Sequence, residues 1–333
     1  MEHGQSFGWC FIGCGTLAHI VAGELVASGR HRIASVFGRS ADKAADFAAQ
    51  FGGKVYASAE EAMRADGVDG VYIVTTHDSH YDYARRALLC GKNVLCEKPM
   101  TMTAAESKAL FALAEERGLY IAEAMWTWFN PVANTVRRWM DEGRLGTVRS
   151  ARIVCHTDGL HYAPRVTDPM AAGGAVLDMG VYALTYCQRL FGPPASLRCV
   201  GDLADGIDRG EEIELCYAGG MHLPISMSVF GAEGGEFFEA VGDKGVLTVE
   251  RFHEADSARI RFADGSELRC AGQGNYLNEF DLVAAEMRTG QTDSRYEPRR
   301  VTLAVMEQID ECRRQMRLVY PFEDPGVLDK KSL

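Results

Sequence analysis

Short apolar stretches alternate with helix start and stop signals through the first third of the chain. Because two parallel strands must be joined by a long crossover, most often a helix, this alternation predicts a doubly wound parallel sheet of the α/β class. Glycines and capping residues mark where each apolar stretch gives way to a helix. The strands predicted in this way span residues 8–12, 32–37, 55–56, 68–74, 93–96 and 119–123.

Capping residues locate three of the helices between these strands. Ser40 can accept the hydrogen bond of a first-turn amide and so begin the helix after the second strand. Ser58 with Glu61, and Thr103 with Glu106, have the spacing of a capping box, which satisfies two amides at a helix start. We therefore expect helices directly after these three caps.

The pattern changes after Pro131. One helix is predicted over residues 132–142, and strands separated by glycine-containing turns then dominate, as in "EIELCYAGGMHLPISM", "EAVGDKGVLTV" and "ARIRFADGSELRC". Alternating or apolar runs joined by such turns are typical of β-hairpins. Two helices, 276–289 and 300–316, close the chain. This half is therefore predicted to be α+β, with a largely antiparallel sheet.

Length and composition fit two globular domains. The chain has 333 residues, of which 47% are apolar and 24% charged, enough to bury two cores of ordinary size. We expect the domains at residues 1–125 and 126–333. The formal net charge of −11 disfavours binding to nucleic-acid phosphates as a main function.

Apolar runs and cysteines indicate the compartment. The N-terminal apolar run is only a few residues long before glycine interrupts it, and no apolar segment elsewhere is long enough to cross a bilayer, so we expect neither a signal peptide nor a membrane anchor. The ten cysteines contain no CxxC pair, and Cys10, Cys96 and Cys155 fall inside apolar strands. This favours reduced, buried thiols in a cytoplasmic protein over disulfides.

A glycine-rich turn, "FIGCGTLA", follows the first strand and opens a helix. Gly13 would allow the tight turn, Gly15 the close approach of a pyrophosphate to the backbone, and Ala18 the close packing of helix on strand. The N-terminus of that helix, where Thr16 and Leu17 lie, attracts an anion. The first domain is therefore predicted to bind a dinucleotide through the glycines and these two residues.

The end of the second strand indicates which dinucleotide. An NAD-binding protein usually has an acidic residue there for the ribose 2′-hydroxyl, whereas this chain reads "VFGRSADK". The guanidinium of Arg39, the hydroxyl of Ser40 and the ammonium of Lys43 suit a 2′-phosphate. NADP is therefore the expected cofactor, and NAD is less favoured. The alternative is that Arg39 is a surface residue and Ser40 only a helix cap.

Charged residues follow the fifth strand directly, in "NVLCEKPM". In a doubly wound sheet, ligands bind outside the carboxyl ends of the strands, so Glu97 and Lys98 can face a cofactor and not the core. Pro99 then fixes the turn.

The loop after the fourth strand reaches the same edge with "VTTHDSHY". Thr75 is a candidate for a hydrogen bond to the cofactor, and His77 and His80 for hydrogen bonds to cofactor or substrate; the alternative is that the histidines only begin the next helix. A metal pair at i, i+3 would need further ligands, and none stands nearby in the sequence, so no metal site is expected.

Four segments together resemble the Gfo/Idh/MocA oxidoreductases: "FIGCGTLA", the fifth strand with its E-K-P ending, "TDPMAAGGAVLDMGVYALTY" and "MEQIDECRRQMRLVYPFE". The resemblance spans nearly the whole chain. It implies a Rossmann domain joined to an α/β domain whose large open sheet often forms the oligomer interface, as in a homo-dimer or homo-tetramer. It also implies hydride exchange between a nicotinamide and the hydroxyl or carbonyl carbon of a sugar, cyclitol or related compound.

The segment "GGAVLDMGVYALTY" predicts a helix on which Asp178 and Tyr182, four residues apart, share one face. Family members carry Asp-x-x-x-His or Asp-x-x-x-Tyr here, and the Tyr form resembles glucose–fructose oxidoreductase, xylose dehydrogenase and dimeric dihydrodiol dehydrogenase. Tyr182 is interpreted as proton donor and acceptor, because a nearby ammonium from Lys98 would lower the phenol pKa from its usual value of about 10. Asp178 would orient a substrate hydroxyl.

Ordinary structural roles are the alternatives for these three residues. Asp178 could only complement the helix dipole, Tyr182 could be a core tyrosine, and Lys98 could pair with Glu97 alone.

Two further residues are predicted to contact substrate together with Lys98, Asp178 and Tyr182. Trp126, in "EAMWTWFNP", could stack on a sugar ring or fill an inter-domain core. His161, in "GLHYAPRVTDP", could cover the substrate or lie at the rim of its pocket. Relatives similar to dihydrodiol dehydrogenase tend to have arginine in place of the following tryptophan of "WTW", which weakens any transfer of their substrate.

The sequence therefore predicts a cytoplasmic NADP-dependent oxidoreductase that acts on a polyol, keto-sugar or trans-dihydrodiol, with no nucleic-acid or membrane partner. Two alternatives stay open: a redox-neutral sugar-converting enzyme that retains its nicotinamide, and a non-catalytic dinucleotide-binding regulator. The presence of Lys98, Asp178 and Tyr182 together argues against the regulator, which has no chemical need for all three.

Overall fold

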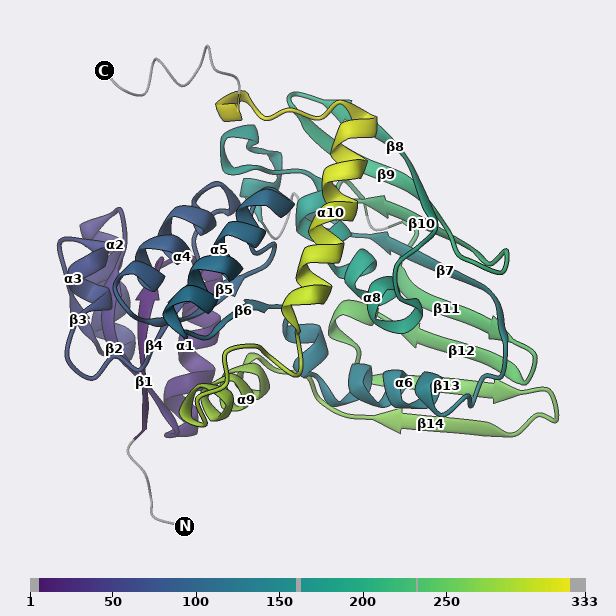
Figure 1. Ribbon diagram of the computed structural model, residues 1–333, viewed down its shortest axis with the longest axis horizontal. Helices are drawn as coiled ribbons and strands as arrows, with labels where there is room; N and C mark the ends of the chain where they lie inside the picture. The colour runs from purple at the N-terminus through teal and green to yellow at the C-terminus, as the bar shows by residue number, and fades with distance from the viewer. Residues whose placement is uncertain (1–5, 160–162, 232, 324–333) are drawn as a thin grey trace. The chain divides into compact units, whose positions relative to one another are not determined.

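The computed structural model describes residues 6–159, 163–231 and 233–323 (Figure 1). The chain divides into two compact units. The first comprises residues up to Trp126 together with Asn275–Thr302, and the second comprises Thr127–Gly274 together with residues from Leu303 onward. The segment 275–302 thus groups with the first unit, although the boundary drawn from the sequence left it in the second domain.

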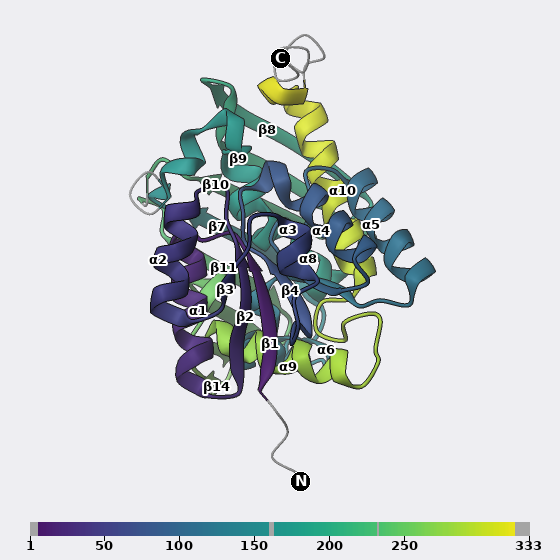
Figure 2. The same cartoon turned by 90° about the vertical axis from the view of Figure 1, so that its left-hand side faces the viewer.

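The first unit is built on a parallel sheet of six strands in the order β3-β2-β1-β4-β5-β6, which confirms the predicted doubly wound fold. Helices α1 and α2 lie on one face, and α3, α4 and α5 on the other (Figure 2). The strands are β1 (Phe7–Ile12), β2 (His31–Phe37), β3 (Lys54–Val55), β4 (Gly70–Ile73), β5 (Asn93–Glu97) and β6 (Ile121–Ala124). The helices are α1 (Thr16–Ser28), α2 (Ala41–Phe51), α3 (Ala59–Met63), α4 (His80–Leu89), α5 (Ala104–Arg117) and α9 (Tyr276–Arg288), with a 3₁₀ turn η1 (His77–Ser79).

The predicted helix caps are confirmed. The hydroxyls of Ser40, Ser58 and Thr103 each accept a hydrogen bond from the backbone N–H three residues on. Strand β6 begins two residues later than predicted, because Gly118 first ends α5 in the left-handed conformation, with φ of 63°.

Helix α9 is tied to the first unit by one fully buried aromatic side chain, Phe280. Its ring centroid lies 4.9 Å from the ring of Trp9 on β1 and 4.9 Å from the ring of Tyr72 on β4, and both contacts are edge-on. Edge-to-face pairs of this kind stabilise a core beyond the area that they bury. The aromatic cluster therefore joins a segment that is remote in the sequence to the centre of the sheet.

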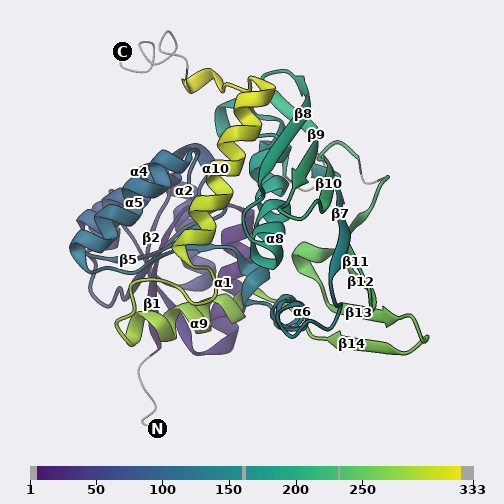
Figure 3. The same cartoon turned by 45° about the vertical axis from the view of Figure 1, so that its right-hand side comes forward.

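The second unit is built on a mostly antiparallel sheet of eight strands in the order β14-β13-β12-β11-β7-β10-β9-β8, as predicted (Figure 3). The three predicted hairpins are β9–β10, β11–β12 and β13–β14. The exception is β7, which pairs in parallel with β10 and antiparallel with β11. The strands are β7 (Val148–His156), β8 (Ser196–Ala204), β9 (Ile207–Cys216), β10 (His222–Ser228), β11 (Glu236–Gly242), β12 (Gly245–Glu250), β13 (Ser257–Phe262) and β14 (Glu267–Ala271).

One face of this sheet is apolar and packed, and the other is polar. On β9, Ile213 and Leu215 are buried, while the alternate residues Glu212 and Glu214 are exposed or half-exposed. Helices cover the apolar face, as the contact of Tyr186 on α8 with Phe238 on β11 shows. The helical elements are α6 (Pro131–Asp141), α8 (Val181–Phe191), α10 (Arg299–Met316), the short η2 (Trp126–Phe129), η3 (Pro164–Thr167), η4 (Pro169–Ala171), η6 (Phe252–Glu254) and η7 (Pro321–Glu323), and the π-helix η5 (Val176–Gly180).

The lengths of the helices and the burial of the cysteines can be compared with the predictions from the sequence. No helix among them combines the length and the apolar character needed to cross a bilayer. Most of the ten cysteines are buried, as expected for small apolar core residues.

Replacing Phe280 by alanine is expected to lower the free energy of unfolding of the first unit by about 3–5 kcal/mol, because it opens a cavity between α9 and the sheet. Urea denaturation measures this loss. Leu89→Ala, at an exposed position on α4, is the control and should change stability by less than about 0.5 kcal/mol. Equal stability of the two variants would contradict the packing of α9 described here.

Candidate functional site

The turn after β1 requires glycine at its first position. Gly13 has φ of 114°, which side chains rarely adopt, and an added Cβ would lie 2.5 Å from the carbonyl oxygen of Val74. Its N–H donates to the carbonyl oxygen of Phe37 at 2.9 Å. The turn therefore lies between the ends of β2 and β4, at the carboxyl edge of the sheet.

Gly15 leaves open space at the start of α1. Among the residues that the structure describes, an added Cβ would meet nothing within 4 Å and no side chain caps α1, whose first turn also lacks an acidic residue. The first-turn amides and the positive end of the helix dipole are therefore available to an anion. Thr16 is exposed and Leu17 half-buried at this end, while Ala18 is fully buried against the sheet. These features fit the pyrophosphate of a dinucleotide.

The end of β2 presents two cations and a hydroxyl. Arg39, Ser40 and Lys43 are all exposed. The hydroxyl oxygen of Ser40 accepts from the backbone N–H of Lys43 at 3.3 Å, so Ser40 is a helix cap. A capping hydroxyl keeps its own proton for a second partner, so the same three groups also fit a 2′-phosphate.

The loops after β4 and β5 are joined by His80. Its buried ring has Nδ1 2.8 Å from the carbonyl oxygen of Pro99 and Nε2 3.3 Å from the carbonyl oxygen of Thr75. His77 is buried beside it, with 5.8 Å between the ring centroids, and the hydroxyl of Ser79 donates to that of Thr75 at 2.8 Å. Both histidines therefore support the loops. Their contact with a cofactor, and that of Thr75, stays a prediction.

Strand β5 ends at Glu97, and Lys98 follows it directly; both side chains are buried. The carboxylate of Glu97 accepts from the hydroxyl of Tyr72 at 2.6 Å and from the backbone N–H of Lys98 at 3.2 Å. Burial, and then the charge of Glu97, raises the pKa of Tyr72 well above its usual range, so this hydroxyl stays a donor. Glu97 thus bonds to the interior of the first unit, whereas the sequence analysis let it face the cofactor. The Lys98–Pro99 peptide bond is cis.

Two buried acids of the first unit were not singled out from the sequence. Glu123 on β6 accepts from the backbone N–H of Met100 at 2.8 Å and from the hydroxyl of Thr302 at 3.1 Å. Burial raises the pKa of Glu123 to about 7, a rise that the charge of Lys98 opposes. Glu279 on α9 is fully buried, its carboxyl oxygens have no hydrogen-bond partner among the described residues, and burial raises its pKa well above the usual range. A carboxylate inside the apolar strand "IAEA" was the available signal for Glu123.

In the second unit, Asp178 lies in a π-helical turn that precedes α8. The prediction of one continuous α-helix is wrong here, since residues 176–180 form η5 and Tyr182 lies in the first turn of α8. Single π-helical turns are frequent at functional sites. Asp178 is nearly buried, and its Oδ1 accepts from the guanidinium of Arg165 at 2.8 Å. The carboxylate therefore has a fixed direction and a neutralising partner.

Asp208, a buried acid of β9, anchors the start of this turn, and a second buried acid, Glu211, lies on the same strand. Oδ2 of Asp208 accepts from the backbone N–H of Val176 at 2.6 Å, and Gly174 lies so close that an added Cβ would collide with Oδ1. Burial raises the pKa of both Asp208 and Glu211, and the charge of Asp208 raises that of Glu211 further. The two carboxyl groups therefore release their protons at higher pH than isolated carboxyl groups do.

Tyr182 packs against a histidine–glutamate pair that the sequence analysis missed. The ring centroids of Tyr182 and His253 are 5.1 Å apart. Nδ1 of His253 lies 2.7 Å from Oε1 of Glu236, which also accepts from the backbone N–H of His253 at 3.0 Å. The hydroxyl of Thr127 donates to the carbonyl oxygen of His253 at 2.5 Å. The imidazole is therefore held at both its backbone and its ring, next to the phenol.

The aromatic candidates divide between the units. Trp126 stacks on Tyr276 within the first unit, with ring centroids 4.8 Å apart and planes 24° apart. Trp128 is fully buried in the second unit, where the guanidinium of Arg189 lies 4.6 Å from its ring centroid. Trp128 is therefore a core residue, and stacking of Trp126 on a sugar stays a prediction. His161 lies outside the described residues.

The predicted site residues thus form two sets, one in each unit. The first set surrounds the turn after β1 and fits the phosphates of a dinucleotide. The second set offers a fixed carboxylate, Asp178, and a phenol, Tyr182, which are suited to orient a hydroxyl and to exchange its proton. The meeting of Lys98 with the second set at one reacting carbon stays a prediction.

Comparison with known families assigns both units. Residues 7–124 match the Gfo/Idh/MocA "Oxidoreductase family, NAD-binding Rossmann fold", and residues 133–248 match the Gfo/Idh/MocA C-terminal domain.

Individual proteins and solved structures are also similar to this chain over nearly its whole length. The trans-1,2-dihydrobenzene-1,2-diol dehydrogenase of Mus musculus is 28% identical over 327 residues, which cover 94% of this chain and 98% of that protein. The 3-ketoreductase KijD10 from Actinomadura kijaniata, solved with NADP and TDP-benzene, has a TM-score of 0.81 at 23% identity and covers 94% of this chain and 98% of its own. GenD2 from gentamicin A biosynthesis, solved with NAD, has a TM-score of 0.80 at 23% identity. The match covers 95% of this chain and 96% of GenD2. The two structures show that the fold is shared.

The raised pKa of Glu123 predicts a pH-dependent stability. Between pH 4.5 and 7 the folded chain holds a proton on Glu123 that the unfolded chain has released, so this residue makes stability fall as pH rises through that window. Glu123→Gln removes the titration, and the variant should gain on the order of 2–3 kcal/mol relative to wild type between pH 5 and 8.

Urea denaturation at a series of pH values measures this difference. Glu116→Gln, on the exposed side of α5, makes the same chemical change at the surface and serves as the control. Parallel stability profiles for wild type and Glu123→Gln would show that Glu123 is ionised in the folded chain throughout this range.

Proposed function

Because this chain belongs to the Gfo/Idh/MocA family of oxidoreductases, we propose that it is an NADP-dependent dehydrogenase or reductase acting on a hydroxyl or carbonyl carbon of a sugar, cyclitol or trans-dihydrodiol. The observation that carries the proposal is the pair of fixed groups in the second unit, the carboxylate of Asp178 held by Arg165 and the phenol of Tyr182 packed on His253. Oxidation of an alcohol needs one group to orient the hydroxyl and one to take its proton.

The relatives support the substrate class. One is named as a dehydrogenase of a trans-dihydrobenzenediol, and another as a 3-ketoreductase. Both names describe oxidation or reduction at a carbon that bears oxygen. A small, oxygen-rich substrate is therefore the proposal for this chain as well.

Arg39 is the residue proposed to select NADP over NAD. Its exposed guanidinium at the end of β2 can bind a 2′-phosphate through two parallel, charge-assisted hydrogen bonds, with Ser40 as a further donor. The turn at Gly13 and Gly15, with the start of α1, would hold the pyrophosphate. When bound, the nicotinamide supplies or accepts the hydride.

Tyr182 is the proposed proton donor and acceptor. A phenol has a usual pKa of about 10, too high for an efficient base near neutral pH, and a nearby ammonium lowers it. Lys98, at the end of β5, is proposed to supply that positive charge. The imidazole of His253, anchored on Glu236, keeps the phenol ring in one position, and Arg165 does the same for the carboxylate of Asp178.

Assembly and compartment complete the proposal. We expect a homo-dimer or homo-tetramer formed through the eight-stranded sheet, and a cytoplasmic location in which the free cysteines stay reduced.

Arg39→Ala should raise KM for NADPH by about 10–100-fold and leave KM for NADH nearly unchanged, because the lost hydrogen bonds reach only a 2′-phosphate. Steady-state kinetics with each cofactor measures this. Arg85→Ala removes an exposed guanidinium of α4 and is the matched control. If Arg39→Ala changed KM for NADPH and KM for NADH by the same factor, Arg39 would not be the residue that selects NADP over NAD.

Lys98→Ala and Tyr182→Phe should each lower kcat by about 10²–10⁴-fold, since each removes part of the proton transfer. NADPH should still raise the melting temperature of both variants. Tyr186→Phe is the matched control: this buried hydroxyl has no hydrogen-bond partner among the described residues, so its loss should leave kcat unchanged.

Screening sugars, inositols and diols with NADP⁺ and NADPH supplies the substrate for these assays. Near-normal turnover of both Lys98→Ala and Tyr182→Phe would refute the proton-transfer assignment. Tight NADPH binding without turnover of any compound would favour the regulator, and product formation without net cofactor change would favour the redox-neutral enzyme.

A further inference from the structure

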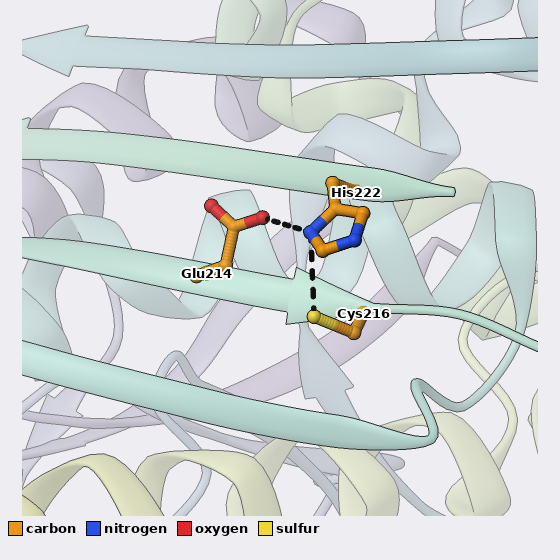
Figure 4. A group of neighbouring side chains, drawn as sticks. All are labelled: Glu214, Cys216 and His222. Atoms are coloured by element: carbon orange, nitrogen blue, oxygen red, sulfur yellow. Dashed lines mark hydrogen bonds and ion pairs between the residues drawn. The ribbon is translucent and has the colours of Figure 1, made fainter. Parts of the chain in front are cut away.

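Three side chains with metal-ligating atoms converge on the polar face of the eight-stranded sheet (Figure 4). Nδ1 of His222 lies 2.9 Å from Oε1 of Glu214 and 3.5 Å from Sγ of Cys216. All three ligand atoms lie within 4.8 Å of one another. A search of the described residues for three or more histidine, cysteine or acidic side chains that are close enough to share one ion finds this group.

The hairpin β9–β10 sets this geometry. Cys216 is the direct cross-strand partner of His222, and Glu214 stands two residues before Cys216, so all three side chains leave the sheet on the same face. β9 and β10 are both interior strands of the sheet, flanked by β8 and β7. The backbones of Glu214 and Cys216 are therefore held by paired strands on both sides, and His222, at the start of β10, is held by its pairing with β9.

The spacings approach those of a tetrahedral zinc ion. With Zn–S of about 2.3 Å and Zn–N and Zn–O of about 2.0–2.1 Å, a tetrahedral site has S···N of about 3.6 Å and N···O of about 3.4 Å. The observed separations are 3.5 and 2.9 Å. The side chains of His222 and Glu214 are 65% and 38% exposed, so they can open by a few tenths of an ångström through rotation about their own bonds.

We propose that Glu214, Cys216 and His222 form a Zn²⁺ site with one coordination position left for water. Thiolate and imidazole are zinc ligands, whereas Mg²⁺ and Ca²⁺ require oxygen ligands, so the donor set favours Zn²⁺ over Mg²⁺ and Ca²⁺. The site is separate from the residues proposed for cofactor and substrate, and it does not depend on the proposed oxidoreductase activity.

Zinc binding exchanges protons for metal bonds. In the metal-free chain Nδ1 of His222 donates to Glu214; on binding, this proton moves through solvent to Nε2, and Nδ1 ligates the ion. The thiol of Cys216 releases its proton and ligates as thiolate, while Glu214 ligates as carboxylate. One proton per ion is therefore released, so Zn²⁺ affinity should rise with pH.

Neighbouring charges on the same face are of both signs. Glu212 of β9 accepts from the hydroxyl of Ser226 at 2.6 Å, and that hydroxyl lies 2.9 Å from Nε2 of His156 on β7. Arg198 of β8 is the cross-strand neighbour of Glu214.

Titration of the metal-free full chain with ZnCl₂ by isothermal calorimetry tests the proposal, and Co²⁺ absorption reports a thiolate ligand. Wild type should bind one ion per chain and show thiolate-to-cobalt charge transfer. Cys216→Ser and His222→Ala should each weaken Zn²⁺ binding by at least about tenfold, because losing even a residue that is hydrogen-bonded to a metal ligand lowers metal affinity by about that factor. Cys216→Ser should also abolish the charge-transfer band.

Cys270→Ser is the matched control, because Cys270 is also a half-exposed strand cysteine of the same sheet. It should bind Zn²⁺ as wild type does, and melting temperature without metal shows that each variant is folded. The proposal fails if wild type binds no Zn²⁺, or if Cys216→Ser and His222→Ala bind it as tightly as wild type, which would place the ion elsewhere on the chain.

Discussion

One backbone position, Gly13, is the constraint on which the carboxyl edge of the first unit depends. Its N–H bonds to the last residue of β2, and the space where a Cβ would stand is filled by the carbonyl group that follows β4. Three strand ends are thereby held together without any side chain between them. The start of α1 is left open to an anion as a consequence, and the loops after β4 and β5, joined by His80, end at the same edge.

Both units place buried acids next to the segments that carry the functional side chains. Glu123 and Glu279 lie in the interior of the first unit. In the second unit Asp208 anchors the turn that carries Asp178, and Glu211 is buried on the same strand. Burial favours the neutral form of each acid, so every one of them reduces stability as pH rises. Perturbed carboxyl groups of this kind cluster at functional sites and also occur in structural networks, and here Glu123 and Asp208 hold backbone amides in place.

The two groups of candidate site residues in the second unit are brought together by different contacts, one local and one between distant parts of the chain. Glu214, Cys216 and His222 are neighbours because a hairpin with a short connection brings them into register. Asp178 and Tyr182 depend on partners that are distant along the chain. Asp178 lies in a π-helical turn anchored on β9, and Tyr182 packs on a histidine whose ring is held from β11. The first kind of site follows from local pairing, whereas the second requires the whole unit to be folded.

The sequence by itself determined the strands of the first sheet, the caps at Ser40, Ser58 and Thr103, the three hairpins and the family, because each is written in local periodicity, turn chemistry or a contiguous motif. Only the tertiary structure decided that α9 joins the first sheet through Phe280, that β7 pairs in parallel with β10, and that His253 and Glu236 support Tyr182. Periodicity reports whether a residue is buried and not what buries it. Contacts between distant segments arise from the packing of the whole unit, which no local pattern records.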